Sequence, residues 1–171
     1  MASNIDRYLN YLKNTVLSNQ NLCKYLYYND KNPLSQPDIV DTNASLYLDK
    51  RNQKLFVTPF TFDVTDQTKT TLTIMIDNFR IDNKSNYYED INVYFIIACN
   101  VRLWELDDGS GEVKLRVNGV WDELNRTFKR QYGVGLGKNH FQNGRIQKFN
   151  DYFWGYTWCL SATDFPFDKG L

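Results

Sequence analysis

The sequence predicts an α+β domain in which a mainly antiparallel sheet of about five strands carries one long helix. Three observations favour this fold. Apolar residues occupy every odd position from Ile91 to Leu103, which puts one continuous apolar row on a long strand. Residues 113–130 carry apolar side chains at helical spacing. The chain also holds 12 Tyr, 11 Phe and 4 Trp against 9 Gly, a composition typical of sheets and of large contact surfaces.

The first segment, residues 1–26, is predicted to be an N-terminal helix that Ser3 or Asn4 caps. Its apolar residues recur at helical spacing, and the polar run Asn19–Asn21 is where the helix could be interrupted or end. Residues 27–54 follow as a long loop rich in Pro, Asn and Asp. Ordered loops of this length are usually functional, so we expect it to be an interaction loop.

Three strands are predicted next. Residues 55–62 form the first, and Pro59 places it at a sheet edge or a bulge. Residues 70–81 form the second, whose apolar row slips by one near Asp77–Asn78 and so indicates a β-bulge. The third, residues 91–106, is expected to pair antiparallel with the second. Its middle is apolar at even positions as well, which predicts cover on both faces there.

The second half contributes a helix and two more strands. Residues 113–130 form the helix, and Gly119 in its middle is explained by a close approach to the sheet. Residues 140–149 are polar and are predicted as a hairpin arm, with Asn143–Gly144 as its turn. Residues 153–160 form an aromatic last strand. The expected order is therefore α–β–β–β–α–β–β.

The 171 residues are predicted to form a single domain, with residues 55–171 as its sheet-plus-helix core. Twenty basic and twenty acidic side chains cancel, which argues against a protein that coats DNA. Cys23, Cys99 and Cys159 lie in apolar runs without metal or redox spacing, and are expected to be buried reduced thiols. Neither a signal peptide nor a membrane span is expected.

A glycine-rich loop at residues 132–138 is the nearest approach to a catalytic motif. It holds three glycines and a lysine at the positions Gly133, Gly135, Gly137 and Lys138. A Walker A loop needs Gly and then Ser or Thr where this chain has Tyr132 and Asn139. The loop also follows a helix, so it is interpreted as a helix stop and a turn.

The remaining polar residues do not predict an enzyme. His140 is the single histidine, which argues against a triad or a metal site. The carboxylate pairs Asp107/Asp108 and Asp122/Glu123 are expected to serve a turn and a solvated helix face. We therefore predict no catalytic, metal or cofactor-binding residue.

Large side chains alternate along the last strand, FWGYTWCL, so that Trp154, Tyr156, Trp158 and Leu160 share one face. Such a strand can be half core and half subunit interface, because Trp and Tyr dominate protein–protein hot spots. It could instead stack sugar rings, as in a carbohydrate-binding module. The first interpretation is favoured, and the second stays open.

Several stretches, taken in order, resemble the neck and tail-completion proteins of tailed bacteriophages, the group of tail-terminator and head-to-tail joining proteins. They are the N-terminal helix leading into LCKYLYYNDKNPLSQPDI, the strand INVYFIIACNVRLWEL, the helix LRVNGVWDELNRTFKRQ, the turn YGVGLGK and the strand FWGYTWCL. Together they cover most of the chain. The family has no active site to carry over.

The resemblance implies a small α+β subunit that forms a homo-oligomeric ring, often a hexamer, in the neck of the virion at the top of the tail. Such a ring caps the tail tube and joins it to the head, contacts tail-tube and neck or connector proteins, and lets DNA through its lumen without sequence-specific binding. It is made in the host cytoplasm and needs no cofactor and no membrane.

Interface residues are expected on the loops 27–43 and 132–138 and on the aromatic strand. They are Tyr27, Tyr28, Pro33, Leu34, Pro37, Tyr132, Gly133, Gly135, Gly137, Lys138, Trp154 and Trp158. Two other functions remain open: a different neck ring, such as a head-closure or connector protein, and a β-rich carbohydrate-binding module.

Overall fold

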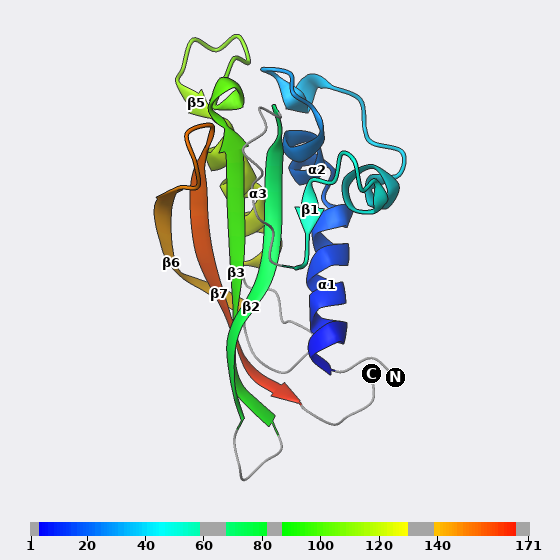
Figure 1. Ribbon diagram of the computed structural model, residues 1–171, viewed down its shortest axis with the longest axis vertical. Helices are drawn as coiled ribbons and strands as arrows, with labels where there is room; N and C mark the ends of the chain where they lie inside the picture. Colours follow the sequence, from blue (N-terminus) through cyan, green and yellow to red (C-terminus); the bar gives the residue numbers. More distant parts are fainter. Residues whose placement is uncertain (1–3, 59–67, 82–86, 130–138, 167–171) are drawn as a thin grey trace.

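The computed structural model describes residues 4–58, 68–81, 87–129 and 139–166, and it shows one five-stranded sheet with helices against one face (Figure 1). The helices are α1 (Asn4–Ser18), α2 (Gln20–Tyr27) and α3 (Arg116–Phe128). The sheet has the order β1 (Leu55–Phe56), β2 (Thr70–Ile81), β3 (Tyr87–Asn100), β7 (Phe153–Pro166) and β6 (Asn139–Lys148). Only the β1–β2 pair is parallel, which confirms the predicted α+β class and mainly antiparallel sheet.

The predicted N-terminal helix is two helices, separated at Asn19. The backbone of Asn19 is extended rather than helical, and its side chain caps α2 by accepting a hydrogen bond from the Leu22 amide at 3.0 Å. Its amide nitrogen also donates to Glu123 at 3.2 Å and to Thr127 at 2.8 Å, both on α3. The interruption that the sequence indicated therefore also ties α2 to α3. Residues 27–54, predicted as loop, contain the 3-10 helix η1 (Pro33–Ser35) and the π-helix η2 (Ala44–Leu48).

The core lies between the helices and one face of the sheet. The predicted odd row of β3 is buried as far as Cys99. The apolar stripe of α3 packs on β3, and that of α1 packs on β2. The main contributors are Tyr8, Leu12 and Val16 of α1, Leu72 and Ile74 of β2, Val93, Phe95 and Ile97 of β3, and Val117, Val120, Leu124 and Phe128 of α3.

The central strand is shorter than predicted at its C-terminal end. β3 ends at Asn100 and the chain turns into the 3-10 helix η3 (Val101–Leu103), with Val101 45% exposed. The Asn100 side chain accepts a hydrogen bond from the Arg102 amide at 3.0 Å, a local bond that competes with the strand ladder. The predicted antiparallel pairing of β2 and β3 is confirmed, and so is the bulge, because the register shifts between Ile76 and Asn78.

Two predicted elements begin or end elsewhere. The first strand is only β1, and the predicted part from Pro59 to Phe62 lies outside the described residues. α3 begins at Arg116, three residues after the prediction, and Val113 is 82% exposed because the two-stranded ribbon of β4 (Glu105–Leu106) and β5 (Lys114–Leu115) precedes the helix. Gly119 meets a helix rather than the sheet, since a Cβ there would lie 2.5 Å from Cζ of Tyr25 on α2.

The Asn143–Gly144 pair is not a turn. β6 continues through it with a register shift between Phe141 and Gly144, so the pair forms a bulge, and the chain reverses at residues 149–152. A Cβ on Gly144 would lie 2.3 Å from the Trp158 ring, so packing on β7 decides this position. β7 also extends to Pro166, six residues beyond the prediction.

All three cysteines are free. Cys23 and Cys99 are buried, as predicted, and burial raises their pKa values to about 12 and about 11. Cys159 departs from the prediction because its side chain is only half-buried, on the sheet face that the helices leave open.

Candidate interaction surfaces

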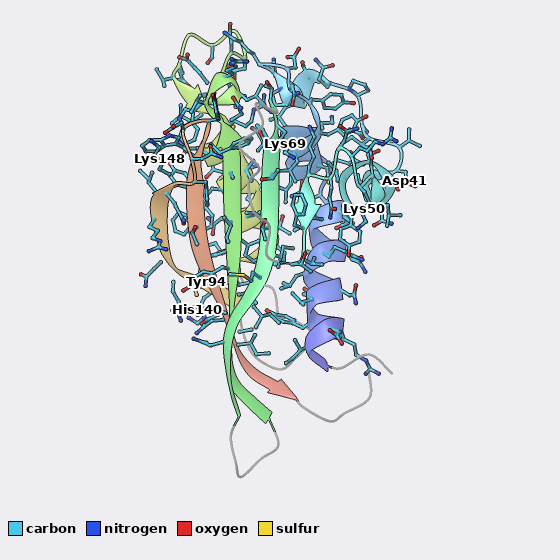
Figure 2. The ribbon with its side chains drawn as sticks, in the orientation of Figure 1. Asp41, Lys50, Lys69, Tyr94, His140 and Lys148 are labelled. Carbon is cyan, nitrogen blue, oxygen red and sulfur yellow. The ribbon has the colours of Figure 1, made fainter. Side chains whose placement is uncertain are left out.

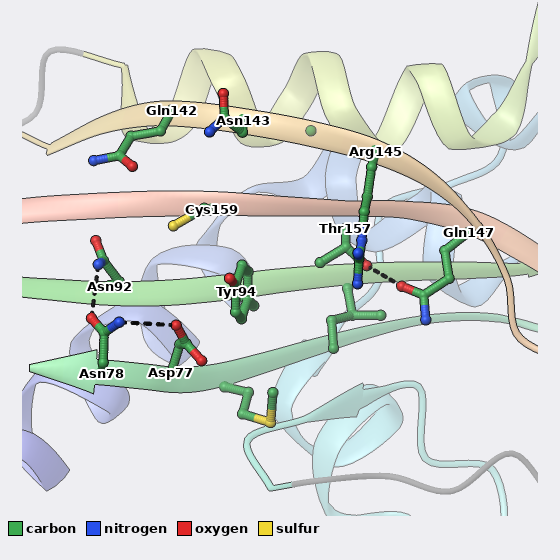
Figure 3. Close-up of a pocket in the computed structure, with 13 residues that line it drawn as sticks. Asp77, Asn78, Asn92, Tyr94, Gln142, Asn143, Arg145, Gln147, Thr157 and Cys159 are labelled. Atoms are coloured by element: carbon green, nitrogen blue, oxygen red, sulfur yellow. Dashed lines mark hydrogen bonds between the residues drawn. The ribbon is translucent and has the colours of Figure 1, made fainter.

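The sheet face opposite the helices forms a hollow of about 550 Å³ across β2, β3, β7 and β6 (Figure 3). Within the described part of the chain no helix packs on this face. The predicted cover on both faces of mid-β3 is present at Ala98, which is buried, but Tyr94 and Ile96 are only half-buried and line the hollow. The hollow is lined mainly by polar side chains, and we call it the amide face. Its principal residues are Asn78, Asn92, Tyr94, Gln142, Arg145 and Gln147.

A chain of hydrogen bonds crosses the four strands along one side of the amide face. Gln142 Nε2 donates to Ser161 Oγ at 2.7 Å, and Ser161 Oγ donates to Asn92 Oδ1. Asn92 Nδ2 then donates to Asn78 Oδ1 at 2.8 Å, and Asn78 Nδ2 to the Asp77 carboxylate at 3.2 Å (Figure 3). Every donor points toward Asp77, so the bonds polarise one another and hold the amides in fixed orientations.

The floor and the opposite side of the amide face lie outside this chain of hydrogen bonds. Tyr94 and Ile96 are half-buried on the floor, and Arg145 extends over it from β6 (Figure 3). Among the described residues, no carboxylate lies within ion-pair distance of Arg145. Burial and the negative charge of Asp77 raise the pKa of Cys159, so this thiol stays protonated and is a poor nucleophile.

A second hollow, of about 530 Å³, lies at the end of the sheet where β3 becomes η3. We call it the tryptophan hollow. Its apolar lining is Val101, Trp104, Leu115 and Trp154, joined by the exposed charges of Lys31, Arg102 and Glu105. Trp154 is 37% exposed, and Lys148 Nζ lies 5.7 Å from its ring centroid.

A third surface is the loop of residues 36–43, which we call the Val40 loop. Val40 is fully exposed at 104%, next to the exposed carboxylate of Asp41. The loop is nonetheless held firmly, because the buried Ile39 exchanges two backbone hydrogen bonds of 3.0 Å with the Gln20 side chain. Asp38 forms an ion pair of 2.8 Å with Lys24. Figure 2 shows Asp41 and Lys148 on opposite sides of the molecule, and Lys148 lies beside Trp154, so the Val40 loop lies across the molecule from the Trp154 end of the tryptophan hollow.

A buried arginine supports both the loop region and the tryptophan hollow. The Arg116 side chain is 0% exposed and donates to four backbone carbonyls. Nε bonds Leu103 at 3.0 Å, Nη1 bonds Tyr25 at 3.0 Å and Tyr28 at 2.8 Å, and Nη2 bonds Asp30. Burial lowers its pKa, and the C-terminal carbonyls of α2 favour its positive charge. Arg116 thus fixes the end of α2 against η3.

The YomW family model matches residues 19–162. The chain belongs to the YomW family. YomW is a protein of the SPbeta phage region of Bacillus, so this YomW-family chain is a phage-related protein. No curated protein matches the chain.

The loop residues predicted as interface are unequally available in this YomW-family chain. Tyr27 and Leu34 are 40% and 41% exposed, and Pro37 is exposed. Tyr28 is half-buried and donates its hydroxyl to the Pro37 carbonyl at 3.0 Å. Pro33 is buried within the chain and so presents no side chain to a partner. The predicted loop residues Tyr132, Gly133, Gly135, Gly137 and Lys138 lie outside the described residues.

The aromatic strand is divided between two roles. Trp158 stacks on Trp121 of α3 with ring centroids 3.6 Å apart and planes at 6°. Tyr156 donates its hydroxyl to Asn118 at 2.9 Å, also on α3. Both of these rings are therefore engaged by helix α3. Of the three aromatic residues on this face of the strand, Trp154 is the one that lines a hollow.

Three of the carboxylates considered for chemistry, Asp107, Asp108 and Glu123, have structural partners. Asp107 and Asp108 accept hydrogen bonds from the amides of Gly109 and Ser110, at 3.0 and 3.1 Å, as expected in a turn. Glu123 is buried rather than solvated, a departure from the prediction, because the Asn19 amide reaches it across the helix pair. Among the residues that the structure describes, no group of His, Cys, Asp or Glu could hold a metal ion.

None of the helices in the described ranges is long and apolar enough to cross a membrane. Sequence reasoning missed most of the amide face. Asn92 and Tyr94 alternate with the apolar row of β3, which is a local signal. Asn78, Gln142 and Arg145 join them through the strand order and the bulges of β2 and β6. Only the bulge of β2 has a signal in the sequence.

Proposed function

We propose that this YomW-family chain is a structural subunit of a phage virion that assembles head to tail into a ring at the junction of head and tail. Its function is that of a tail terminator, which caps the tail tube and lets DNA pass through the ring. The observation that carries the proposal is the position of two unlike surfaces, the Val40 loop and the tryptophan hollow, on opposite sides of the subunit. A head-to-tail contact uses two different patches, and it gives a ring when the rotation between neighbouring subunits closes.

The two surfaces complement each other in shape and charge. The Val40 loop projects an exposed valine beside Asp41, with Asp38 paired to Lys24, while the apolar lining of the tryptophan hollow is bordered by two cations, Lys31 and Arg102, and one anion, Glu105. A valine placed between two tryptophans buries apolar surface at about 25 cal/mol per Å². The opposite charges favour the correct orientation more than they add affinity. Membership of a phage-related family supports the same setting.

The test is the native mass of purified protein, by light scattering or native mass spectrometry. Wild type is expected as a closed ring, whereas Val40→Asp and Trp154→Ala are each expected to be monomeric. Asn14→Asp, on the exposed side of α1, adds the same charge elsewhere and should leave the ring intact.

Mixing the two variants tests the head-to-tail geometry itself. Val40→Asp keeps a working hollow and Trp154→Ala keeps a working loop, so the mixture can form one contact and should give a dimer. A two-fold contact between identical patches would give no such dimer. If both variants still form rings, the contact lies elsewhere. If wild type is monomeric and does not bind purified tail tubes, the proposed function is contradicted.

Another neck ring, such as a head-closure or connector protein, would have the same subunit contacts. The partner distinguishes it from a terminator. Purified rings are expected to bind the end of tail tubes and not isolated portal rings, and the reverse result would assign the chain to the head side.

A further inference from the structure

The amide face is a hollow that takes no part in the proposed ring contact between the Val40 loop and the tryptophan hollow. We infer that it binds an acidic oligosaccharide, with sugar hydroxyls on the amide row and the acidic group against Arg145. The inference does not depend on the proposed function, because the amide face shares no lining residue with the tryptophan hollow and none with the Val40 loop.

The size of the hollow suits a ligand of a few sugar units. Its volume of about 550 Å³ falls inside the usual range of small-ligand sites, about 300–1,000 Å³. The lining comes from four adjacent strands of one sheet, so the site is built on rigid elements (Figure 3). A rigid site loses little conformational entropy on binding.

The hydrogen-bond chain prepares the amides for hydroxyl groups. Each amide of Asn78 and Asn92 uses one N–H and one oxygen lone pair inside the chain. Each therefore keeps a second N–H and a second lone pair in a fixed direction. A sugar hydroxyl both donates and accepts, so a row of such amides can bind successive hydroxyls in either sense. The Asp77 carboxylate at the end of the chain is a further acceptor.

Two other residues complete the site: Tyr94 for the sugar ring and Arg145 for the acidic group. The Tyr94 ring lies half-buried on the floor and offers an apolar surface for the face of a sugar ring. The Arg145 guanidinium, without an ion-pair partner among the described residues, reaches over the same floor from β6 (Figure 3). A carboxylate, sulfate or phosphate on the ligand would give it a charge-assisted bidentate bond.

Other occupants fit this surface less well. A nucleic acid takes most of its affinity from cations that neutralise many phosphates, and the hollow offers only Arg145 against Asp77. The proposed sugar instead takes most of its contacts from hydroxyl groups on the amides and uses Arg145 for one acidic group. A protein partner would need several large anchors at the centre of the contact, where the hollow has one aromatic, Tyr94, with Met75 and Ile96 among mostly polar side chains. An apolar protein surface placed on the oriented amides would leave their N–H groups and oxygens without hydrogen bonds, which costs free energy.

The first experiment applies the full-length protein to a glycan array and then titrates it by calorimetry with tetragalacturonic acid and with neutral cellotetraose. Acidic glycans are expected among the array ligands, and tetragalacturonic acid is expected to bind more tightly than cellotetraose. Arg145→Gln should weaken tetragalacturonic acid about tenfold and leave cellotetraose unchanged. Tyr94→Ala should weaken both, and Arg126→Gln on α3 is the matched control that should weaken neither.

A second readout uses Cys159, which lines the hollow beside Tyr94. Saturating tetragalacturonic acid should slow its alkylation by iodoacetamide in the intact protein. The monomeric Val40→Asp variant should bind the sugar as well as wild type does, so a failed ring and a failed sugar site are distinguishable.

Three results would overturn the inference. They are an array without any bound glycan, binding that survives both Arg145→Gln and Tyr94→Ala, and a loss of native mass in Tyr94→Ala. The last result would mean that another protein chain covers the amide face.

Discussion

Replacing Arg116 with methionine is expected to lower the free energy of unfolding by about 3–5 kcal/mol. The wild-type guanidinium is fully buried and donates to four backbone carbonyls, those of Tyr25, Tyr28, Asp30 and Leu103. Hydrogen bonds from a charged donor contribute about 1.5–3 kcal/mol each, so four would give about 6–12 kcal/mol. Burying the charge costs several kcal/mol, which offsets part of that gain. Methionine fills the space but leaves the carbonyls without a donor.

A loss of this size is large for a single domain, whose total stability is about 5–15 kcal/mol. Urea unfolding followed by tryptophan fluorescence measures it directly, and the m-value should stay unchanged if the folded state keeps its compactness. Arg116→Lys should fall between wild type and Arg116→Met, because one ammonium group cannot reach carbonyls that surround a planar fork.

The matched control lies on the same helix. Arg126 has a side chain that is 72% exposed and an ion pair of 3.0 Å with Glu123. Exposed ion pairs contribute about 0–1 kcal/mol, so Arg126→Met should cost little. The reasoning would be refuted if Arg116→Met unfolded within about 1 kcal/mol of Arg126→Met, because the four buried bonds would then contribute no more than one surface pair.

Three further predictions concern the fold. Gly155→Ala should prevent stable folding, seen as lost near-UV circular dichroism, because its Cβ would lie 1.8 Å from the Ile97 carbonyl oxygen; a native spectrum would contradict this. Asn19→Ala removes the cap of α2 and its bonds to α3, and should cost about 1–3 kcal/mol in urea unfolding, whereas a loss below about 0.5 kcal/mol would show that the cap is dispensable. Burial and nearby cations lower the pKa of Lys54 from 10.5 to about 8, so the unfolded chain binds more protons between these values. The stability of wild type relative to Lys54→Met should therefore rise with pH across that window, and a flat difference would refute the lowered pKa.

Local periodicity was enough to predict the class of the fold. The apolar row of β3 and the helical stripe of α3 are patterns that each segment carries by itself. The row of β3 is buried as predicted up to Cys99, and the stripe of α3 packs in the core from Val117 onward. The bulge between Ile76 and Asn78 was predicted as well, because a slip in a period of two is visible within one strand.

The errors occur where a distant partner overrides a local signal. Asn143–Gly144 has the chemistry of a hairpin turn, yet it lies inside β6 because pairing with β7 and contact with Trp158 require a glycine there. Glu123 and Arg116 belong by spacing to a polar helix face, yet both are buried because α2 supplies their partners. No pattern within α3 carries that information.

The sequence by itself determined the elements that hydrophobic period specifies, and it indicated a phage protein through resemblance alone. The tertiary structure decided which side chains meet. Asp77, Asn78, Asn92, Gln142 and Ser161 are dispersed along the chain, and only the strand order and register of β2, β3, β7 and β6 bring them into one hydrogen-bond chain. The same holds for the Val40 loop and the tryptophan hollow, because the opposition of two surfaces is a property of the packed subunit. Periodicity is local, whereas a binding surface depends on contacts between segments that are far apart in sequence.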